Sequence, residues 1–173
     1  MITKEQEKWI NHLSDTNKVI ITPYNPETPA IFIEIANNIH ATLGEGIEIQ
    51  HRGASSFKIS GQGELDIYLP TEESKYKFMV EKLKTLFGNP ESNYPLERAR
   101  FVTFVRGTRA EIFVINNKSK GWLDSLRFES ALEKDQTLLD KYRLLKEKGN
   151  GLSTRAYYRQ KIEFINNILE IAG

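Results

Sequence analysis

The chain has 173 residues and no cysteine, which excludes disulfides, zinc–thiolate centres and thiol nucleophiles, and its length suits one domain with a core of its own. It carries 24 basic and 23 acidic residues, and this balance argues against duplex DNA as a partner, because non-specific binding to phosphates needs a basic surplus. No apolar run reaches the roughly 18 residues of a membrane span, and the opening MITKEQEKW lacks an apolar signal core, so we expect a cytoplasmic protein without a membrane partner.

The first quarter of the chain is predicted to contain two helices joined by an extended segment. Thr3 and Gln6 have the spacing of a capping box at the start of a short helix. The β-branched run at 19–22 indicates a brief strand or an extended arm. A second helix is expected to begin within the turn at 25–29 and to end at Gly44.

The middle of the chain is predicted to form a small sheet. Thr71 is expected to cap an amphipathic helix at 75–87. The last two strands are close enough to form a hairpin through the connection at 106–109. The expected strands cover residues 47–51, 64–69, 101–105 and 111–115.

The remainder of the chain has a helical pattern from Ser119 onward, broken once at 149–151, with Ser153 as the cap of the last helix. The mixed charges across 129–148 indicate a solvated helix face. These elements predict a single α+β domain with a small mixed β-sheet, flanking helices and a C-terminal helical hairpin. Its expected parts are an N-terminal helix at 1–18, a sheet core at 19–117 and C-terminal helices at 118–173.

Two carboxylates on one expected strand suggest metal chemistry. Side chains alternate along a strand, so Glu64 and Asp66 share a face, where they repel each other unless a cation or water lies between them. Glu111 on a later strand offers a third carboxylate, and hard divalent ions take such oxygen ligands. We predict that Glu64, Asp66 and Glu111 bind metal. Two alternatives stay open, a solvated strand face for the pair and cross-strand ion pairing for Glu111.

The loop between the first two strands is a candidate phosphate site. Gly53, Ser55 and Ser56 offer backbone N–H groups and hydroxyls to phosphate oxygens, and Arg52, Lys58 and Arg109 are the predicted cationic partners. Tyr68 shares the face of Asp66 and is a candidate to stack on a base, whereas His51 is expected to be a hydrogen-bonded structural residue. Further available cations are Arg106, Arg155, Arg159 and Lys161.

A strand, a small-residue loop and a strand bearing E-x-D resemble the nucleotidyltransferase superfamily typified by DNA polymerase beta. More specifically, the chain resembles the GrpB family from about Val19 to about Leu169. The run VIITPYNP resembles the family's opening, the segment His51-Arg52-Gly53-Ala54-Ser55 its His-x-Gly-Ser-Thr, and the C-terminal helices its closing helices. The chain departs from the family pattern at Ala54, where serine is usual, and at Glu111, where many relatives carry histidine.

This resemblance implies a nucleotidyltransferase-like fold and an enzyme that uses two Mg²⁺ or Mn²⁺ ions. It implies transfer of a nucleoside monophosphate from a nucleoside triphosphate to an unknown hydroxyl acceptor, which is a small molecule, a protein side chain or an RNA end. Glu64, Asp66 and Glu111 would be the catalytic residues, with Asp66 bridging the ions. The alternatives are a catalytically silent nucleotide-binding domain and an interaction domain whose working surface is the hairpin at 119–171.

Overall fold

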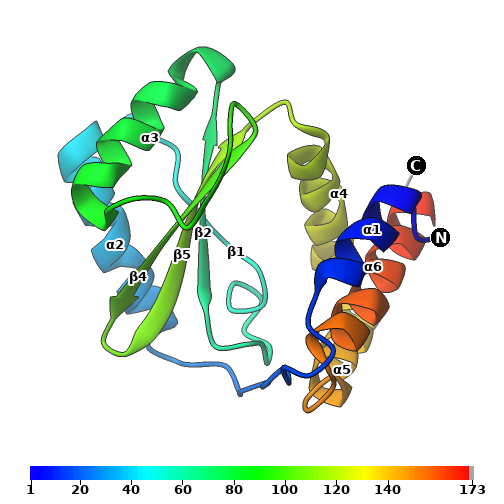
Figure 1. The fold of residues 1–173 in the computed structure, drawn as a ribbon. Coiled ribbons are helices and arrows are strands. Elements are labelled where there is room, and N and C mark those ends of the chain that lie inside the picture. Colours follow the sequence, from blue (N-terminus) through cyan, green and yellow to red (C-terminus); the bar gives the residue numbers. More distant parts are fainter. Residues whose placement is uncertain (172–173) are drawn as a thin grey trace. The chain divides into compact units, whose positions relative to one another are not determined.

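The computed structural model describes residues 1–171, and the chain divides into two compact units (Figure 1). The helical unit comprises Met1–Pro23, Ser60–Gln62 and the chain from Asp124 onward, and the sheet unit comprises Tyr24–Ile59 and Gly63–Leu123. The helices are α1 (Lys4–His12), α2 (Thr28–Leu43), α3 (Glu73–Phe87), α4 (Lys120–Lys134), α5 (Gln136–Lys148) and α6 (Thr154–Ile171). The strands are β1 (Gln50–Arg52), β2 (Leu65–Thr71), β3 (Ser92–Tyr94), β4 (Arg98–Val105) and β5 (Thr108–Asn116).

The sheet has five strands in the order β1-β2-β5-β4-β3. Strands β2 and β5 pair in parallel, and the other neighbours pair antiparallel, which confirms the predicted small mixed sheet and the α+β class. Strands β4 and β5 form the predicted hairpin. Its two-residue loop, Arg106 and Gly107, has φ values of 49° and 76°, the left-handed pair that suits the twist of a hairpin.

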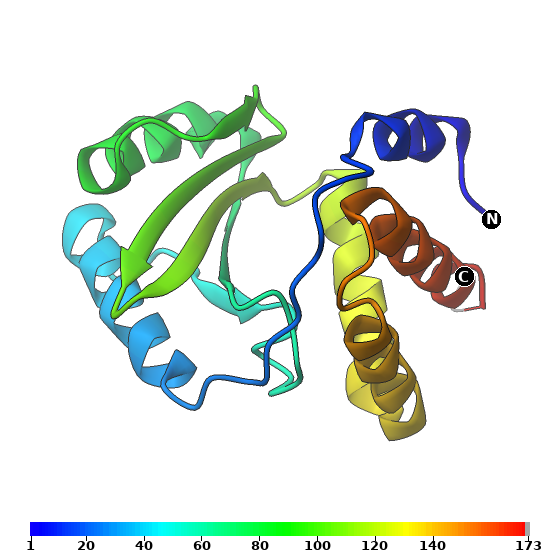
Figure 2. The same cartoon turned by 60° about the horizontal axis from the view of Figure 1, so that its bottom comes forward.

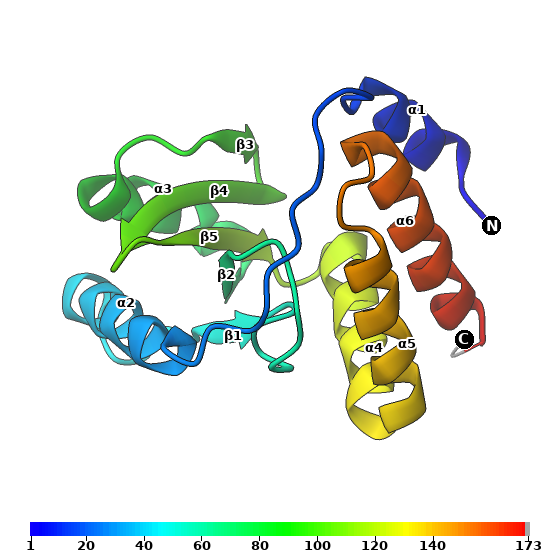
Figure 3. The same cartoon turned by 90° about the horizontal axis from the view of Figure 1, so that it is seen from below.

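The core of the sheet unit lies on one face of the sheet, which α2 and α3 cover side by side (Figure 3). Ile31, Ile35 and Ile39 form the buried stripe of α2 at helical spacing, as the sequence predicts. Leu65 and Ile67 lie in the same core, because alternate residues of β2 face the helices. The polar residues between them therefore occupy the other face of the sheet.

Several boundaries in the sheet unit differ from the sequence prediction. Strand β1 begins only at Gln50, and the predicted cap Thr71 is instead the last residue of β2. The hydroxyl of Thr71 donates to the carbonyl of Leu69 (2.9 Å), and the residue before α3 is Glu72. Parallel pairing with β5 holds β2 extended as far as Thr71, which overrides the local helix-start signal.

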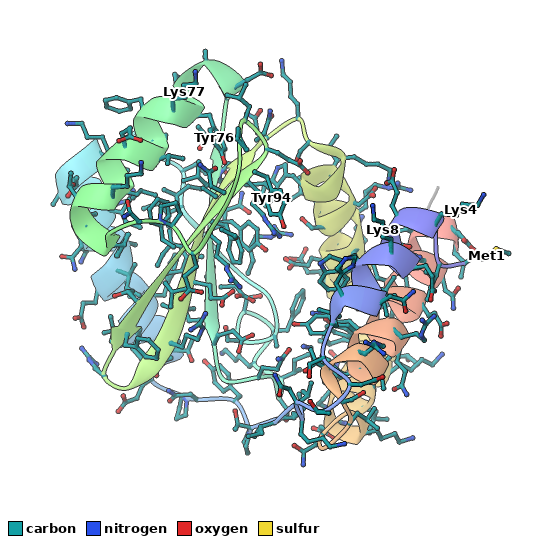
Figure 4. The ribbon with its side chains drawn as sticks, viewed as in Figure 1. Met1, Lys4, Lys8, Tyr76, Lys77 and Tyr94 are labelled. Carbon is teal, nitrogen blue, oxygen red and sulfur yellow. The ribbon has the colours of Figure 1, made fainter. Side chains whose placement is uncertain are left out.

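The short strand β3 was not predicted, because three residues carry no periodic signal. The structure ties it to α3 through Tyr76, whose hydroxyl donates to the carbonyl of Tyr94 (3.3 Å; Figure 4). Tyr76 is 2% exposed, and this burial raises the pKa of its hydroxyl to about 12.

The helical unit contains α1, α5, α6 and most of α4, with α1 beside α6 and α5 beside α4 (Figure 2). The capping box of Thr3 and Gln6 is confirmed, and Ser153 caps α6 by accepting from the N–H of Ala156 (3.2 Å). The prediction of one helix from Ser119 to residue 148 is wrong. Asp135 ends α4 and caps α5 by accepting from Leu138.

The run at 19–22 is an extended arm within the helical unit, held by isolated bridges from Lys18 to Ser153 and from Thr22 to Gly61. Among residues 1–171, no helix is long and apolar enough to cross a bilayer. A division into compact units does not test independent folding, so the single domain stays a prediction.

Candidate functional site

The polar face of the sheet brings three of the predicted residues into one row. Asp66 on β2 lies opposite Arg52 on β1 and opposite Glu111 on β5. Neighbouring strands are about 4.8 Å apart, so the two carboxylates are direct neighbours across the parallel pair. Glu64 precedes β2, which begins at Leu65. The structure therefore pairs Asp66 with Glu111 by register and leaves Glu64 at the approach to the strand.

Glu111 lies within a cluster of arginine side chains. Its Oε1 accepts from Nε and NH2 of Arg109 (3.1 and 2.9 Å) and from NH1 of Arg100 (3.4 Å). Both guanidinium groups also donate to Glu91, each at 3.3 Å. The side chain of Glu111 is only 12% exposed. This is the ion pairing that the sequence leaves open as the alternative role of Glu111.

The arginine contacts of Glu111 affect whether the three predicted carboxylates can hold a metal ion. Among the residues that the structure describes, no group of three or more histidine, aspartate or glutamate side chains is arranged to hold a metal ion. Glu111 directs its Oε1 at two guanidinium groups, which neutralise the charge that a cation would need. Glu111 as arranged is therefore paired with arginines, and the two-ion centre of Glu64, Asp66 and Glu111 stays a prediction.

The turn that follows β1 lies against Asp66. Gly53 has a φ of +77°, and a Cβ added there would overlap Oδ2 of Asp66 and lie 3.3 Å from its Cγ. The turn then forms a single helical winding, in which the N–H of Lys58 donates to the carbonyl of Ser55 (3.2 Å). Only glycine fits this close approach, so the small-residue loop and the strand aspartate meet as the sequence suggests.

The two serines of this turn have different partners. Ser56 donates its hydroxyl to the carbonyl of Gly53 (2.7 Å), within the turn itself. Ser55 Oγ lies 2.8 Å from Nε2 of His51, whose ring stacks on Phe32 at 5.3 Å between centroids. Burial lowers the pKa of His51 below its ordinary value of 6.5, so the ring is neutral at pH 7. His51 is hydrogen-bonded, as expected.

The three predicted phosphate-binding cations differ in availability. Arg52 is 8% exposed, and its guanidinium lies 4.8 Å from the ring centre of Trp122. Arg109 is bound to Glu91 and Glu111. Lys58 is exposed at the end of the turn, with a φ of +56°, and its ammonium pairs with no acidic group among residues 1–171. Of the three, Lys58 is the one that a phosphate can reach without displacing a partner.

The other candidate cations hold the fold together. Arg106 pairs with Glu34 (3.0 Å), and Arg159 donates two hydrogen bonds to Glu7 (2.8 and 2.6 Å). Arg155 donates to the carbonyls of Asn11 and Leu13 at the end of α1, where helix carbonyls lack partners. Lys161 lies over the ring of Tyr158, 5.4 Å from its centre.

Tyr68 is enclosed by aromatic neighbours within the sheet unit. Its ring stacks on Phe113 (4.5 Å between centroids) and on Trp122 (5.7 Å). Phe113 and Trp122 are themselves only 6% and 4% exposed. These contacts occupy part of the half-buried Tyr68 ring, and stacking of Tyr68 on a base stays a prediction.

The fold and this turn define an α+β protein with a five-stranded mixed sheet, in which a glycine turn lies against a strand aspartate. The chain belongs to the family described as GrpB protein, which matches residues 18–170. It is also similar in fold to the crystal structure of conserved protein GrpB from Enterococcus faecalis. The TM-score is 0.67 at 18% identity, and the match covers 88% of this chain and 96% of that chain. A comparison with curated proteins finds no match.

Proposed function

We propose that this GrpB-family chain binds a nucleoside phosphate at the turn from Gly53 to Lys58, with no chemistry that requires a three-carboxylate metal centre. The observation that carries the proposal is the exposed, unpaired ammonium of Lys58 at the end of a turn that also bears Ser55. The cytoplasm stays its expected location.

The backbone of the turn supports the same proposal. The N–H groups of Ala54 and Ser55 donate to no protein acceptor among residues 1–171, whereas the following N–H groups close the helical winding. Two unsatisfied N–H groups at the start of such a winding suit an anion. The turn thus offers two N–H groups and one ammonium, which only donate, and one hydroxyl, which both donates and accepts, to the oxygens of a phosphate.

Replacement of Lys58 tests this proposal. We expect Lys58→Ala to weaken binding of the preferred nucleoside triphosphate roughly tenfold, the effect of losing one hydrogen bond to a charged group. The melting temperature without ligand should not change, because the side chain is exposed and unpaired. Isothermal titration calorimetry with each of the four ribonucleoside triphosphates, with and without Mg²⁺ or Mn²⁺, measures the affinity.

Lys77→Ala is the matched control. Lys77 is another exposed lysine of the sheet unit, on α3 (Figure 4), and it also makes no ion pair. Its removal takes away the same charge from the unit without touching the turn. Equal losses of nucleotide affinity in both variants would show that the effect comes from net charge and not from the turn. No binding to the wild-type protein would refute the proposed function.

Nucleotidyl transfer is the second candidate, favoured by the direct register of Asp66 with Glu111. The acceptor, whether a small molecule, a protein side chain or an RNA end, stays open. A pyrophosphate-release assay with Mg²⁺ or Mn²⁺ separates transfer from binding alone. A transferase releases pyrophosphate and loses this activity in Asp66→Asn, whose folding is checked by circular dichroism. We expect binding without release, because arginines already neutralise Glu111.

A further inference from the structure

His51 and Ser55 form a closely held pair at the start of the proposed phosphate turn. Nε2 of His51 lies 2.8 Å from Oγ of Ser55. The imidazole ring stacks on Phe32 of α2, and the backbone of His51 is held by pairing with Ile67 of β2. Because the ring is held in place, its hydrogen bond controls the direction in which the Ser55 hydroxyl points.

The direction of this hydrogen bond decides what Ser55 offers to an anion. A neutral imidazole carries its hydrogen on one nitrogen only, and a hydroxyl both donates once and accepts. If Nε2 carries no hydrogen, the Ser55 hydroxyl donates to the ring and presents only its lone pairs to a phosphate. If Nε2 carries the hydrogen, Ser55 accepts from the ring and its own hydrogen is free for a phosphate oxygen.

We infer that His51 is a positioning residue whose Nε2–H tautomer makes Ser55 a hydrogen-bond donor to the bound phosphate. The inference rests on the proposed function, since it concerns the same turn. In this inference His51 acts on the phosphate through Ser55, to which its Nε2 is hydrogen-bonded. Ser56 cannot replace Ser55, since its hydroxyl is bound to the carbonyl of Gly53.

Binding of inorganic tripolyphosphate to a set of variants tests the inference without a choice of base. His51→Phe keeps a ring to stack on Phe32 and removes both nitrogens, and Ser55→Ala removes the hydroxyl. We expect each change to weaken binding roughly tenfold, and the double variant to bind no more weakly than either single one, because both remove the same donor. Losses that multiply in the double variant, or wild-type affinity in His51→Phe, would overturn the inference.

His40→Phe is the matched control for a purely structural effect. His40 lies in the same unit, half-buried, with Nε2 3.0 Å from the carbonyl of Ile47. Its loss should lower the melting temperature and leave tripolyphosphate affinity unchanged. If the wild-type protein does not bind tripolyphosphate at all, the proposed function is refuted and the inference with it. If the wild-type protein binds and His51→Phe binds equally well, only the inference is refuted.

A spectroscopic measurement keeps the test valid if His51→Phe does not fold. Long-range proton–nitrogen correlation spectra of the wild-type protein identify which ring nitrogen of His51 carries the hydrogen. With tripolyphosphate bound, we expect Nε2 to be protonated and Nδ1 bare. The opposite tautomer in the complex would overturn the inference, since Ser55 would then donate to the ring and not to the phosphate.

Discussion

Gly53 lies where the turn after β1 crosses the carboxylate of Asp66, and its role rests on backbone geometry. Its φ of +77° is strained for any residue with a Cβ, and the space that a Cβ needs is taken by the Asp66 carboxylate. These are two separate reasons for glycine at one position. Comparison with a second glycine of similar φ can separate the backbone strain from the collision with Asp66.

We predict that Gly53→Ala destabilises the protein by about 1–3 kcal/mol more than Gly107→Ala, because overpacking adds to backbone strain. Gly107 has nearly the same φ, +76°, and no atom within 4 Å of an added Cβ. Urea unfolding measures both variants. If the collision with Asp66 is the cause, Asp66→Ala in the same chain removes the excess; equal costs at the two glycines would contradict it.

At the residue scale the sequence also predicts Ser55 and Ser56 as phosphate ligands without distinguishing them. Adjacent serines in a loop have the same composition and nearly the same position. The winding of the turn directs Ser56 back to the Gly53 carbonyl and Ser55 to His51. Side-chain direction within a turn follows from its dihedral angles, and the sequence pattern carries no measure of these.

At the scale of elements, α1 is attached to α6 by charge pairs. Arg159 binds the carboxylate of Glu7, and Arg155 binds carbonyls at the end of α1 and the carboxylate of Asp15. The hydrogen bond from Arg159 is the main cause that lowers the pKa of Glu7 below 4.5, against the smaller opposing effect of desolvation. A carboxyl whose pKa is lowered by folding stabilises the folded state when it is ionised.

We therefore predict that Glu7→Gln lowers the melting temperature at pH 7 and that the difference from wild type disappears in acid. The stabilisation is present above the unfolded pKa, near 4.5, and is lost as the pH falls through the lower folded value. Thermal scans from pH 3 to pH 7 measure this. Glu5→Gln is the control, because Glu5 lies two residues before Glu7 on the same helix, exposed and without an ion pair. If the difference in melting temperature between Glu7→Gln and wild type stayed unchanged in acid, the ion pair with Arg159 would not be its cause.

Most charged side chains at 129–148 are exposed or half-buried, as the pattern predicts, and Lys146 on α5 is the exception. The sequence pattern indicates a solvated face for 129–148, but Lys146 is 4% exposed. Its Nζ lies 5.0 Å from the ring centre of Tyr142 and 3.4 Å from the Tyr157 hydroxyl. A lysine stem packs like an apolar chain while its amine reaches polar partners, so composition alone misjudges such a residue.

At the scale of the whole molecule, the pairing of β2 with β5 is the feature that defines the candidate site. It places Asp66 beside Glu111, which is 45 positions along the chain, across a parallel connection that includes α3, β3 and β4. The sequence predicts both strands and names both carboxylates. It does not predict that Arg100 and Arg109 surround Glu111, because strand order and register follow from packing of the whole sheet.

The sequence by itself determined the α+β class, the capping box of α1, the β4–β5 hairpin and the family, because caps, tight turns and periodic burial are local and leave local signals. Only the tertiary structure decided which carboxylates and cations are free to meet a ligand. Glu111 and Arg109 bind each other, Tyr68 stacks on Phe113, and Lys58 is available. The reason is physical: the chemistry of a charged group depends on the charges within a few ångströms, and strands and turns distant in the chain supply them.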